Sequence, residues 1–190
     1  MAVLVSINRS SGGIPKLPTL EGEIDATGVV GDGHDHEKHR VPEQAISLLD
    51  LELLESIERD FEHALAPGSL GENLTVSGVG VQRLGAGDRL LVGNEDPVIL
   101  EITRVRPPCY VLDAIDERFK RTLWNRIGMY ARVIRGGVVR PNDPIDIETP
   151  NDVTRPLLRS PKPGCEDGRE TARAVLAAHG LVDLPSESGA

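Results

Sequence analysis

The feature that most constrains the fold is the region between residues 68 and 102, where glycines separate short apolar runs. The runs cover residues 74–76, 89–92 and 98–103. Short strands separated by glycine turns are typical of small antiparallel barrels and sandwiches. Aromatic residues make up only 3% of the chain, so its core must be built from Val, Ile and Leu, which favours strands packed in compact layers.

Further strands are expected on both sides of this region, at residues 2–7, 23–30, 129–134 and 145–147. Residues 44–65 carry apolar side chains at steps of three or four, which predicts a helix with one apolar face. A second, short helix is predicted at residues 116–124, with Asp116 as its N-cap. Asp88 and Asp143 are expected to cap turns. The sequence therefore predicts a mostly β, α+β fold with two or three helices.

The composition changes after Thr149. Pro150, Pro156, Pro161 and Pro163 form a linker-like stretch, and residues 171–179 have the pattern of one further helix. We therefore expect a domain at residues 1–149, followed at residues 150–190 by a Pro-rich linker and a short helical tail.

Charge and cysteine content restrict the partners. The chain has 21 Lys and Arg against 30 Asp and Glu, a net charge of -9, which disfavours binding to nucleic acid but allows a local site for a small anion. No stretch approaches the ~20 apolar residues of a membrane span, and the N-terminus does not resemble a secretory signal. Cys109 and Cys165 are far apart in the sequence, as expected of free thiols in a cytoplasmic protein.

Cys109 is the strongest candidate for chemistry. It follows a predicted strand, Pro107 and Pro108 fix the backbone before it, and Arg104 and Arg106 lie close by in the sequence. A thiol acts as a nucleophile or metal ligand in its thiolate form, which nearby guanidinium charge favours. The alternative is a buried cysteine that packs as a small apolar residue. Cys165, which the acidic residues Glu166 and Asp167 follow, is treated as incidental.

Two polar loops are further candidates. The segment Pro67-Gly-Ser-Leu-Gly-Glu-Asn displays Glu72 and Asn73 just before a strand. Such a loop can present an amide and backbone N–H groups to a ligand, or it can be an ordinary turn. Residues 31–40 hold several metal-ligand side chains without the spacing of a zinc motif, and a solvated polar loop is the simpler interpretation. Its metal-ligand side chains are Asp32, His34, Asp35, His36, Glu37 and His39, and its local anion patch would be formed by Lys38, His39 and Arg40.

Taken in order, several segments resemble the MOSC domain, the C-terminal domain type of molybdenum cofactor sulfurases, which is also found as small stand-alone bacterial proteins. The most specific match is Gly68-Ser-Leu-Gly-Glu-Asn-Leu-Thr-Val. The other matching segments are Gly31-Asp, Gln44-Ala-Ile-Ser-Leu-Leu, Gly87-Asp-Arg-Leu, Arg106-Pro-Pro-Cys, Gly128-Met-Tyr-Ala-Arg-Val-Ile and Gly137-Val-Val-Arg-Pro-Asn-Asp. The resemblance covers roughly residues 1–149.

The resemblance implies a β-barrel like the pyruvate kinase barrel domain, and a cysteine that ligates molybdenum or carries sulfane sulfur. That role falls on Cys109. It also implies that Glu72 and Asn73 lie near the site, and that Arg106 with Lys38, His39 and Arg40 faces the anionic pterin phosphate of the molybdenum cofactor.

Three functions remain open on the sequence. The first is binding of the molybdenum cofactor (Mo-molybdopterin), or sulfur transfer fed by a pyridoxal-phosphate cysteine desulfurase. The second is a molybdenum-dependent reductase of N-hydroxylated compounds, which would need a separate electron-donating reductase because the chain has no flavin, haem or iron–sulfur motif. The third is a non-catalytic interaction module in which Cys109 is structural.

Overall fold

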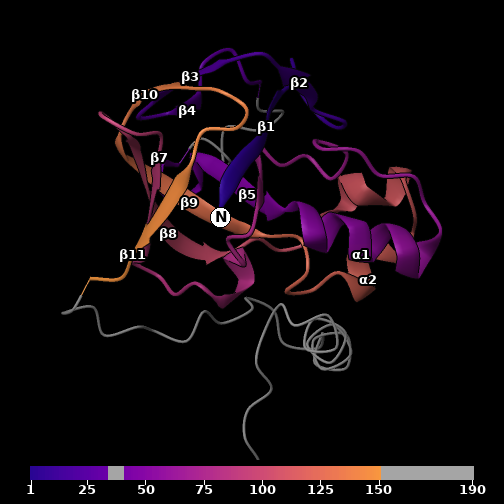
Figure 1. Cartoon of the computed structure of the whole chain (residues 1–190). Helices are drawn as coiled ribbons and strands as arrows, with labels where there is room; N and C mark the ends of the chain where they lie inside the picture. Colours follow the sequence, from indigo (N-terminus) through magenta and orange to yellow (C-terminus); the bar gives the residue numbers. More distant parts are fainter. Residues whose placement is uncertain (34–40, 151–190) are drawn as a thin grey trace, which may run out of the picture.

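The computed structural model describes residues 1–33 and 41–150, and within them the chain is mostly β (Figure 1). The strands are β1 (Val3–Arg9), β2 (Leu17–Thr19), β3 (Gly22–Asp25), β4 (Gly28–Val29), β5 (Ile46–Asp50), β6 (Leu74–Ser77), β7 (Arg89–Val92), β8 (Val98–Val105), β9 (Met129–Arg135), β10 (Gly137–Val139) and β11 (Ile145–Glu148). The helices are α1 (Leu51–Phe61) and α2 (Phe119–Thr122), with 3-10 turns η2 (Pro42–Gln44), η3 (Val81–Arg83) and η4 (Tyr110–Ala114).

The main sheet has eight strands in the order β11-β7-β8-β9-β5-β6-β1-β2. All its neighbouring pairs are antiparallel except β5 and β6. Parallel neighbours need a crossover connection, commonly a helix, and α1 lies on the connection between these two strands. A second sheet of three strands has the order β10-β3-β4. The mostly β, α+β fold class is thus confirmed.

The main sheet rolls toward closure without a continuous ladder between its ends. Val3 of β1 forms an isolated bridge with Pro144, next to β11. The Leu4 N–H donates to the Asp143 carbonyl at 2.9 Å, and the Ile145 N–H donates to the Ala2 carbonyl at 3.0 Å. In Figure 1 the orange β11 accordingly runs beside the indigo β1. These few contacts bring the two ends of the sheet together, so the sheet approaches the barrel expected from the resemblance but does not close.

The predicted helix at residues 44–65 is wrong in its first part, because residues 46–50 form the central strand β5. All five residues of β5 are buried, since the strand lies between β6 and β9 and is covered on both faces. An apolar run of this kind fits a strand as well as a helix. Asp50 is the last residue of β5 and directly precedes α1. Its backbone is extended, and its carboxylate accepts the N–H groups of Gly80 and Val81 at 2.9 and 2.7 Å. The helix ends at Phe61, before Glu62 in the left-handed region.

The second predicted helix is shorter than expected. Only Phe119–Thr122 is α-helical, although the Asp116 carboxylate accepts the Arg118 N–H at 2.8 Å and orders the preceding turn. The predicted turn caps are confirmed: Asp88 accepts the Gly85 N–H, and Asp143 accepts the Arg140 N–H, both at 2.7 Å. The predicted tail helix at residues 171–179 and Cys165 lie outside the described residues.

Two apolar cores stabilise the domain. The first fills the rolled sheet and includes Leu4, Leu48 and Leu100. The second lies between α1 and the connection from β8 to β9, residues 106–128, and includes Leu53, Leu112 and Phe119. β5 joins the two cores, because its neighbouring residues Leu48 and Leu49 belong to different ones. In the part of the chain that the structure describes, no helix is long and apolar enough to cross a membrane.

Candidate functional site

Three of the predicted site residues, Asn73, Arg106 and Cys109, line one cavity of about 140 Å³. The sheet brings them together because β5, β6, β8 and β9 all end or begin near this cavity. Its wall is formed by Gly13, Ile14, Lys16, Gly33, Gln44, Ser47, Gly71, Asn73, Arg106, Cys109, Tyr110, Val111 and Tyr130. The candidate site therefore combines a thiol, two cationic side chains and several amide and hydroxyl groups.

Cys109 lies on the connection from β8 to β9, immediately before the 3-10 turn η4. Its backbone is extended, and its carbonyl accepts the Leu112 N–H at 3.2 Å. The side chain is a half-buried free thiol, and Cys109 belongs to neither apolar core. This placement differs from that of a structural core cysteine and leaves the sulfur open to a ligand in the cavity.

Arg106 supplies a buried positive charge to the cavity wall, with only 6% of its surface exposed. Its guanidinium donates to the Leu70 carbonyl at 2.5 Å and to the Ile127 carbonyl at 3.5 Å. Within residues 1–33 and 41–150 it has no salt bridge to a carboxylate. Backbone carbonyls thus hold the guanidinium in place while its charge is not cancelled by an ion pair there.

Gly71 allows Arg106 to take this position. Its φ of +81° is a conformation that L side chains rarely adopt. A Cβ atom at this residue would lie 2.7 Å from Ile14 Cγ2 and 3.2 Å from an Arg106 terminal nitrogen. The glycine of the Gly-Glu-Asn segment is therefore needed for both backbone geometry and close packing.

Lys16 supplies the second cation and is paired with Asp32. Burial lowers the pKa of Lys16, while the adjacent Asp32 carboxylate opposes this shift. Asp32 also accepts the Asn73 side-chain amide at 2.8 Å and the Ser10 N–H at 3.0 Å. The loops at residues 10–16 and 31–33 are thus joined at the cavity by one carboxylate.

Asn73 is fixed from both ends of its amide. Its oxygen accepts the Ser47 hydroxyl at 2.8 Å and the Ser47 N–H at 3.2 Å, while its nitrogen donates to Asp32. The amide thereby connects β5 to the loop that carries Asp32. Because these bonds occupy the side chain, Asn73 shapes the cavity wall more than it offers free donors.

Glu72 is fully buried and is not among the residues that line the cavity. Its Oε1 accepts the Gly68 N–H at 2.6 Å and the Thr75 hydroxyl at 2.9 Å, while Oε2 has no hydrogen-bond partner among the described atoms. Burial raises the pKa of this carboxyl. The Gly68 carbonyl in turn accepts the Lys16 N–H at 2.9 Å, so Glu72 supports the loop behind the cavity.

Some cavity residues were not predicted from the sequence, and others are not described. Gln44, Ser47 and Tyr130 lie in segments that resemble the MOSC domain but were not singled out as site residues, and Ser47 lies in the segment predicted as helix. Lys16 lies in a segment rich in Ser, Gly and Pro, residues 10–18, without local sign of a partner. The predicted anion patch of Lys38, His39 and Arg40 lies outside the described residues.

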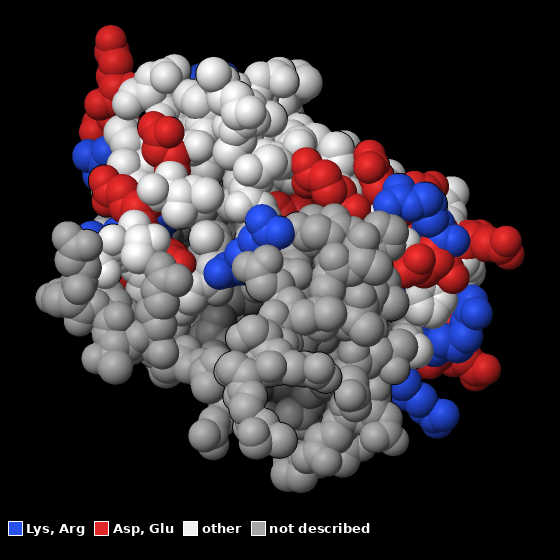
Figure 2. All heavy atoms as spheres, turned by 60° about the horizontal axis from the view of Figure 1, so that its bottom comes forward, with Lys and Arg blue, Asp and Glu red and all other residues white. Residues whose placement is uncertain are grey.

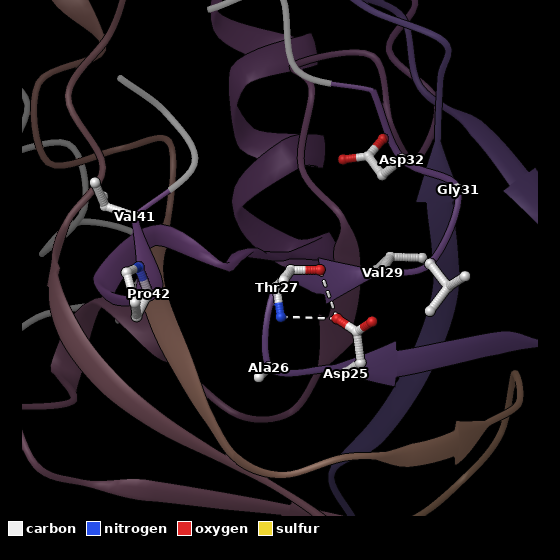
Figure 3. A pocket seen from close by; sticks show the side chains of 9 residues that line it. Asp25, Ala26, Thr27, Val29, Gly31, Asp32, Val41 and Pro42 are labelled. Carbon is white, nitrogen blue, oxygen red and sulfur yellow. Dashed lines mark hydrogen bonds between the residues drawn. The ribbon is translucent and has the colours of Figure 1, made fainter. Parts of the chain in front are cut away.

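A second cavity, of about 360 Å³, is shown in Figure 3. It meets the first at Asp32, whose partners Lys16 and Asn73 line the smaller cavity. Asp25, Thr27, Val29, Asp32 and Pro42 are among its lining residues. The Asp25 carboxylate is engaged locally, because it accepts the N–H and hydroxyl of Thr27 at 2.7 and 2.6 Å. In Figure 3 Asp32 extends its carboxylate from one side of this cavity, with Val41 and Pro42 on the other side.

Charges of both signs alternate on the outer face near α1 and α2. Figure 2 shows Lys and Arg interleaved with Asp and Glu at this end of the molecule. Two of the ion pairs here are Arg118 with Asp116, at 2.6 Å, and the buried Arg126 with Asp60. On the described part of this face no continuous basic area is visible.

The fold and cavity define a small β-rich domain with a cysteine on the wall of a cavity that two buried cations also line. The chain matches the family model of the MOSC domain over residues 35–146, more than half of its length, and it belongs to the MOSC domain family. The resemblance inferred from the sequence is thereby confirmed.

Solved structures of other proteins share the fold. YuaD from Bacillus subtilis is 18% identical, with a TM-score of 0.65 over 77% of this chain and 96% of that chain. YiiM from Geobacillus stearothermophilus is 19% identical, with a TM-score of 0.65 over 94% and 84%. YiiM from Escherichia coli is 20% identical, with a TM-score of 0.62 over 98% and 80%. A comparison with curated proteins gave no match.

Proposed function

We propose that this protein binds the molybdenum cofactor and that the Cys109 thiolate is the protein ligand to molybdenum. MOSC domains are associated with this cofactor. The observation that carries the proposal is the position of Cys109, a half-buried thiol on the wall of a cavity that also holds Lys16 and Arg106. Bound molybdenum would supply two-electron redox chemistry at this thiol.

The residues present fit such a group. A thiolate is a soft ligand that suits this kind of metal site, and Arg106 is a buried cation without a salt bridge in the described residues, which suits an anionic pterin phosphate. Arg106 would hold the cofactor's negative charge, Cys109 its metal, and Tyr110 and Tyr130 would shape the opening. Lys38, His39 and Arg40 remain proposed phosphate contacts.

A sulfur-carrier role uses the same thiol. In that case Cys109 accepts sulfane sulfur as a persulfide from a cysteine desulfurase that contains pyridoxal phosphate, and passes it on. Both roles need a reduced thiol, and we therefore place the protein in the cytoplasm, where thiols stay reduced. The structural-cysteine alternative has less support, because Cys109 lies outside both apolar cores.

A molybdenum-dependent reductase of N-hydroxylated compounds is the second candidate. It is favoured by access to the thiol, because Cys109 is half-buried and lies on the wall of a cavity that opens to the surface. Its electrons would come from a separate reductase. Molybdenum-loaded protein that stays inactive with such a reductase and an N-hydroxylated base would exclude this candidate.

The first experiment is elemental analysis for molybdenum on protein purified without oxygen from a host that makes the cofactor. We expect about one molybdenum per chain in the wild type and loss of most of it in Cys109→Ser, because serine lacks the soft sulfur ligand. Cys165→Ser is the matched control and is expected to keep its molybdenum. Metal retained by Cys109→Ser would contradict ligation by this residue, whereas no metal in any variant would leave the persulfide carrier, which mass spectrometry of Cys109 tests.

A further inference from the structure

Asp32 is a buried carboxylate that three donors from the described residues hold at the cavity. Its Oδ2 pairs with the Lys16 ammonium and accepts the Asn73 amide at 2.8 Å, while Oδ1 accepts the Ser10 N–H at 3.0 Å. Only 3% of the Asp32 side chain is exposed. An ammonium, an amide and a backbone N–H that converge on one carboxylate are the groups that also bind external anions in proteins.

The same carboxylate lies between the two cavities. Asp32 lines the larger cavity of about 360 Å³, and its partners Lys16 and Asn73 line the smaller cavity beside Cys109. Gly33, the next residue, also lines the smaller cavity. The Lys16–Asp32–Asn73 contacts therefore form a partition between the two spaces.

The cavity volumes indicate that the space beside Cys109 does not by itself enclose a large ligand. Sites for organic ligands and cofactors typically have volumes of about 300–1,000 Å³. The cavity beside Cys109, at about 140 Å³, is below this range, whereas the neighbouring cavity lies within it. A ligand of cofactor size bound at Cys109 therefore extends beyond this cavity, either to the open surface or toward the larger cavity, and the second path leads past Asp32.

We propose that Asp32 is a resident anion: its carboxylate occupies a donor set formed by Lys16, Asn73 and Ser10, and an anionic group of the ligand binds there by displacing it. Displacement opens the partition and joins the two cavities. The proposal rests on the proposed function only in placing the ligand beside Cys109. On this proposal Asp32 lowers the affinity of the site for anions, because every anion that enters must compete with a carboxylate already in contact with Lys16.

The first test measures sulfate binding to the full chain by isothermal titration calorimetry, with sulfate as a probe that stays a dianion near neutral pH. Asp32→Asn keeps the size of the side chain and removes its charge. We expect this variant to bind sulfate about tenfold more tightly than the wild type, since a competing charge in contact with Lys16 is lost. Asp25→Asn is the matched control, because Asp25 lines the larger cavity and has no contact with Lys16.

The control should bind sulfate with wild-type affinity, and adding Lys16→Gln to Asp32→Asn should abolish the gain. Equal or weaker sulfate binding by folded Asp32→Asn, or no sulfate binding by any of these proteins, would overturn the proposal and leave Asp32 with the purely structural task of holding residues 31–33.

A second measurement needs only the wild-type fold. In protein labelled with ¹³C at the aspartate carboxyl groups, saturating sulfate should shift the Asp32 resonance and leave that of Asp25 unchanged. A saturated complex without an Asp32 shift would overturn the proposal even if the variants do not fold. Cys109→Ser should bind sulfate like the wild type, so competition by Asp32 and molybdenum ligation by Cys109 can fail independently.

Discussion

At the scale of single residues, the site depends on short backbone contacts that leave little room for substitution. The Leu70 carbonyl holds Arg106, the Gly68 carbonyl accepts the Lys16 N–H, and the Gly71 carbonyl accepts the Ser47 hydroxyl at 3.4 Å. One loop, residues 68–71, thus positions both cavity cations. Glu72 fastens that loop through the Gly68 N–H, which explains how a residue outside the cavity supports the site.

Gly71→Ala tests this dependence. The substitution combines an unfavourable φ with a Cβ 2.7 Å from Ile14 Cγ2, and strain of this kind costs about 1–3 kcal/mol. Gly80→Ala is the matched control: its φ is also left-handed, at +68°, but its Cβ would be 3.5 Å from the nearest atom, in Arg83. Urea unfolding should show a larger loss of stability for Gly71→Ala than for Gly80→Ala. Equal losses would mean that backbone conformation alone, and not close packing beside Arg106, requires the glycine.

At the scale of elements, the sequence predicted strands more accurately than helices. The runs at residues 2–7, 89–92 and 129–134 form β1, β7 and β9, because glycine turns and neighbouring polar residues mark their ends. The interior strand β5 was missed, since it is covered on both faces and its apolar residues have no alternation of period two. Only the tertiary context, with β6 and β9 on either side, determines its conformation.

In the candidate site, too, some residues could be predicted from their local sequence, whereas others are placed only by contacts between distant parts of the chain. Cys109, Arg106 and Asn73 were identified because their segments have unusual sequences and resemble the MOSC domain. Lys16 and Ser47 became site residues only through long-range contacts, with Asp32 and Asn73 respectively. Neither contact has a local sequence pattern, because it depends on how loops from distant parts of the chain meet at the end of the sheet.

At the scale of the whole molecule, the two apolar cores have different relations to the site. The first stabilises the rolled sheet. The second holds Leu70, which precedes Gly71, and Leu112 of the connection that carries Cys109. The sheet thus provides a rigid base, while the position of the thiol depends on packing between α1 and residues 106–128. Loss of packing in the second core should therefore affect Cys109 before the sheet unfolds.

Leu48 and Leu49 allow a matched test of this division, because they are adjacent in β5, equally buried at 0% exposure, and belong to the first and second core respectively. Each Leu→Ala change should lower the free energy of unfolding by about 2–5 kcal/mol. Leu49→Ala should also speed the alkylation of Cys109 by iodoacetamide under native conditions, since local opening around Leu70 and Leu112 becomes easier. Leu48→Ala should leave that rate close to the wild-type value. The same acceleration in both variants would show that the two cores act as a single cooperative unit around the thiol.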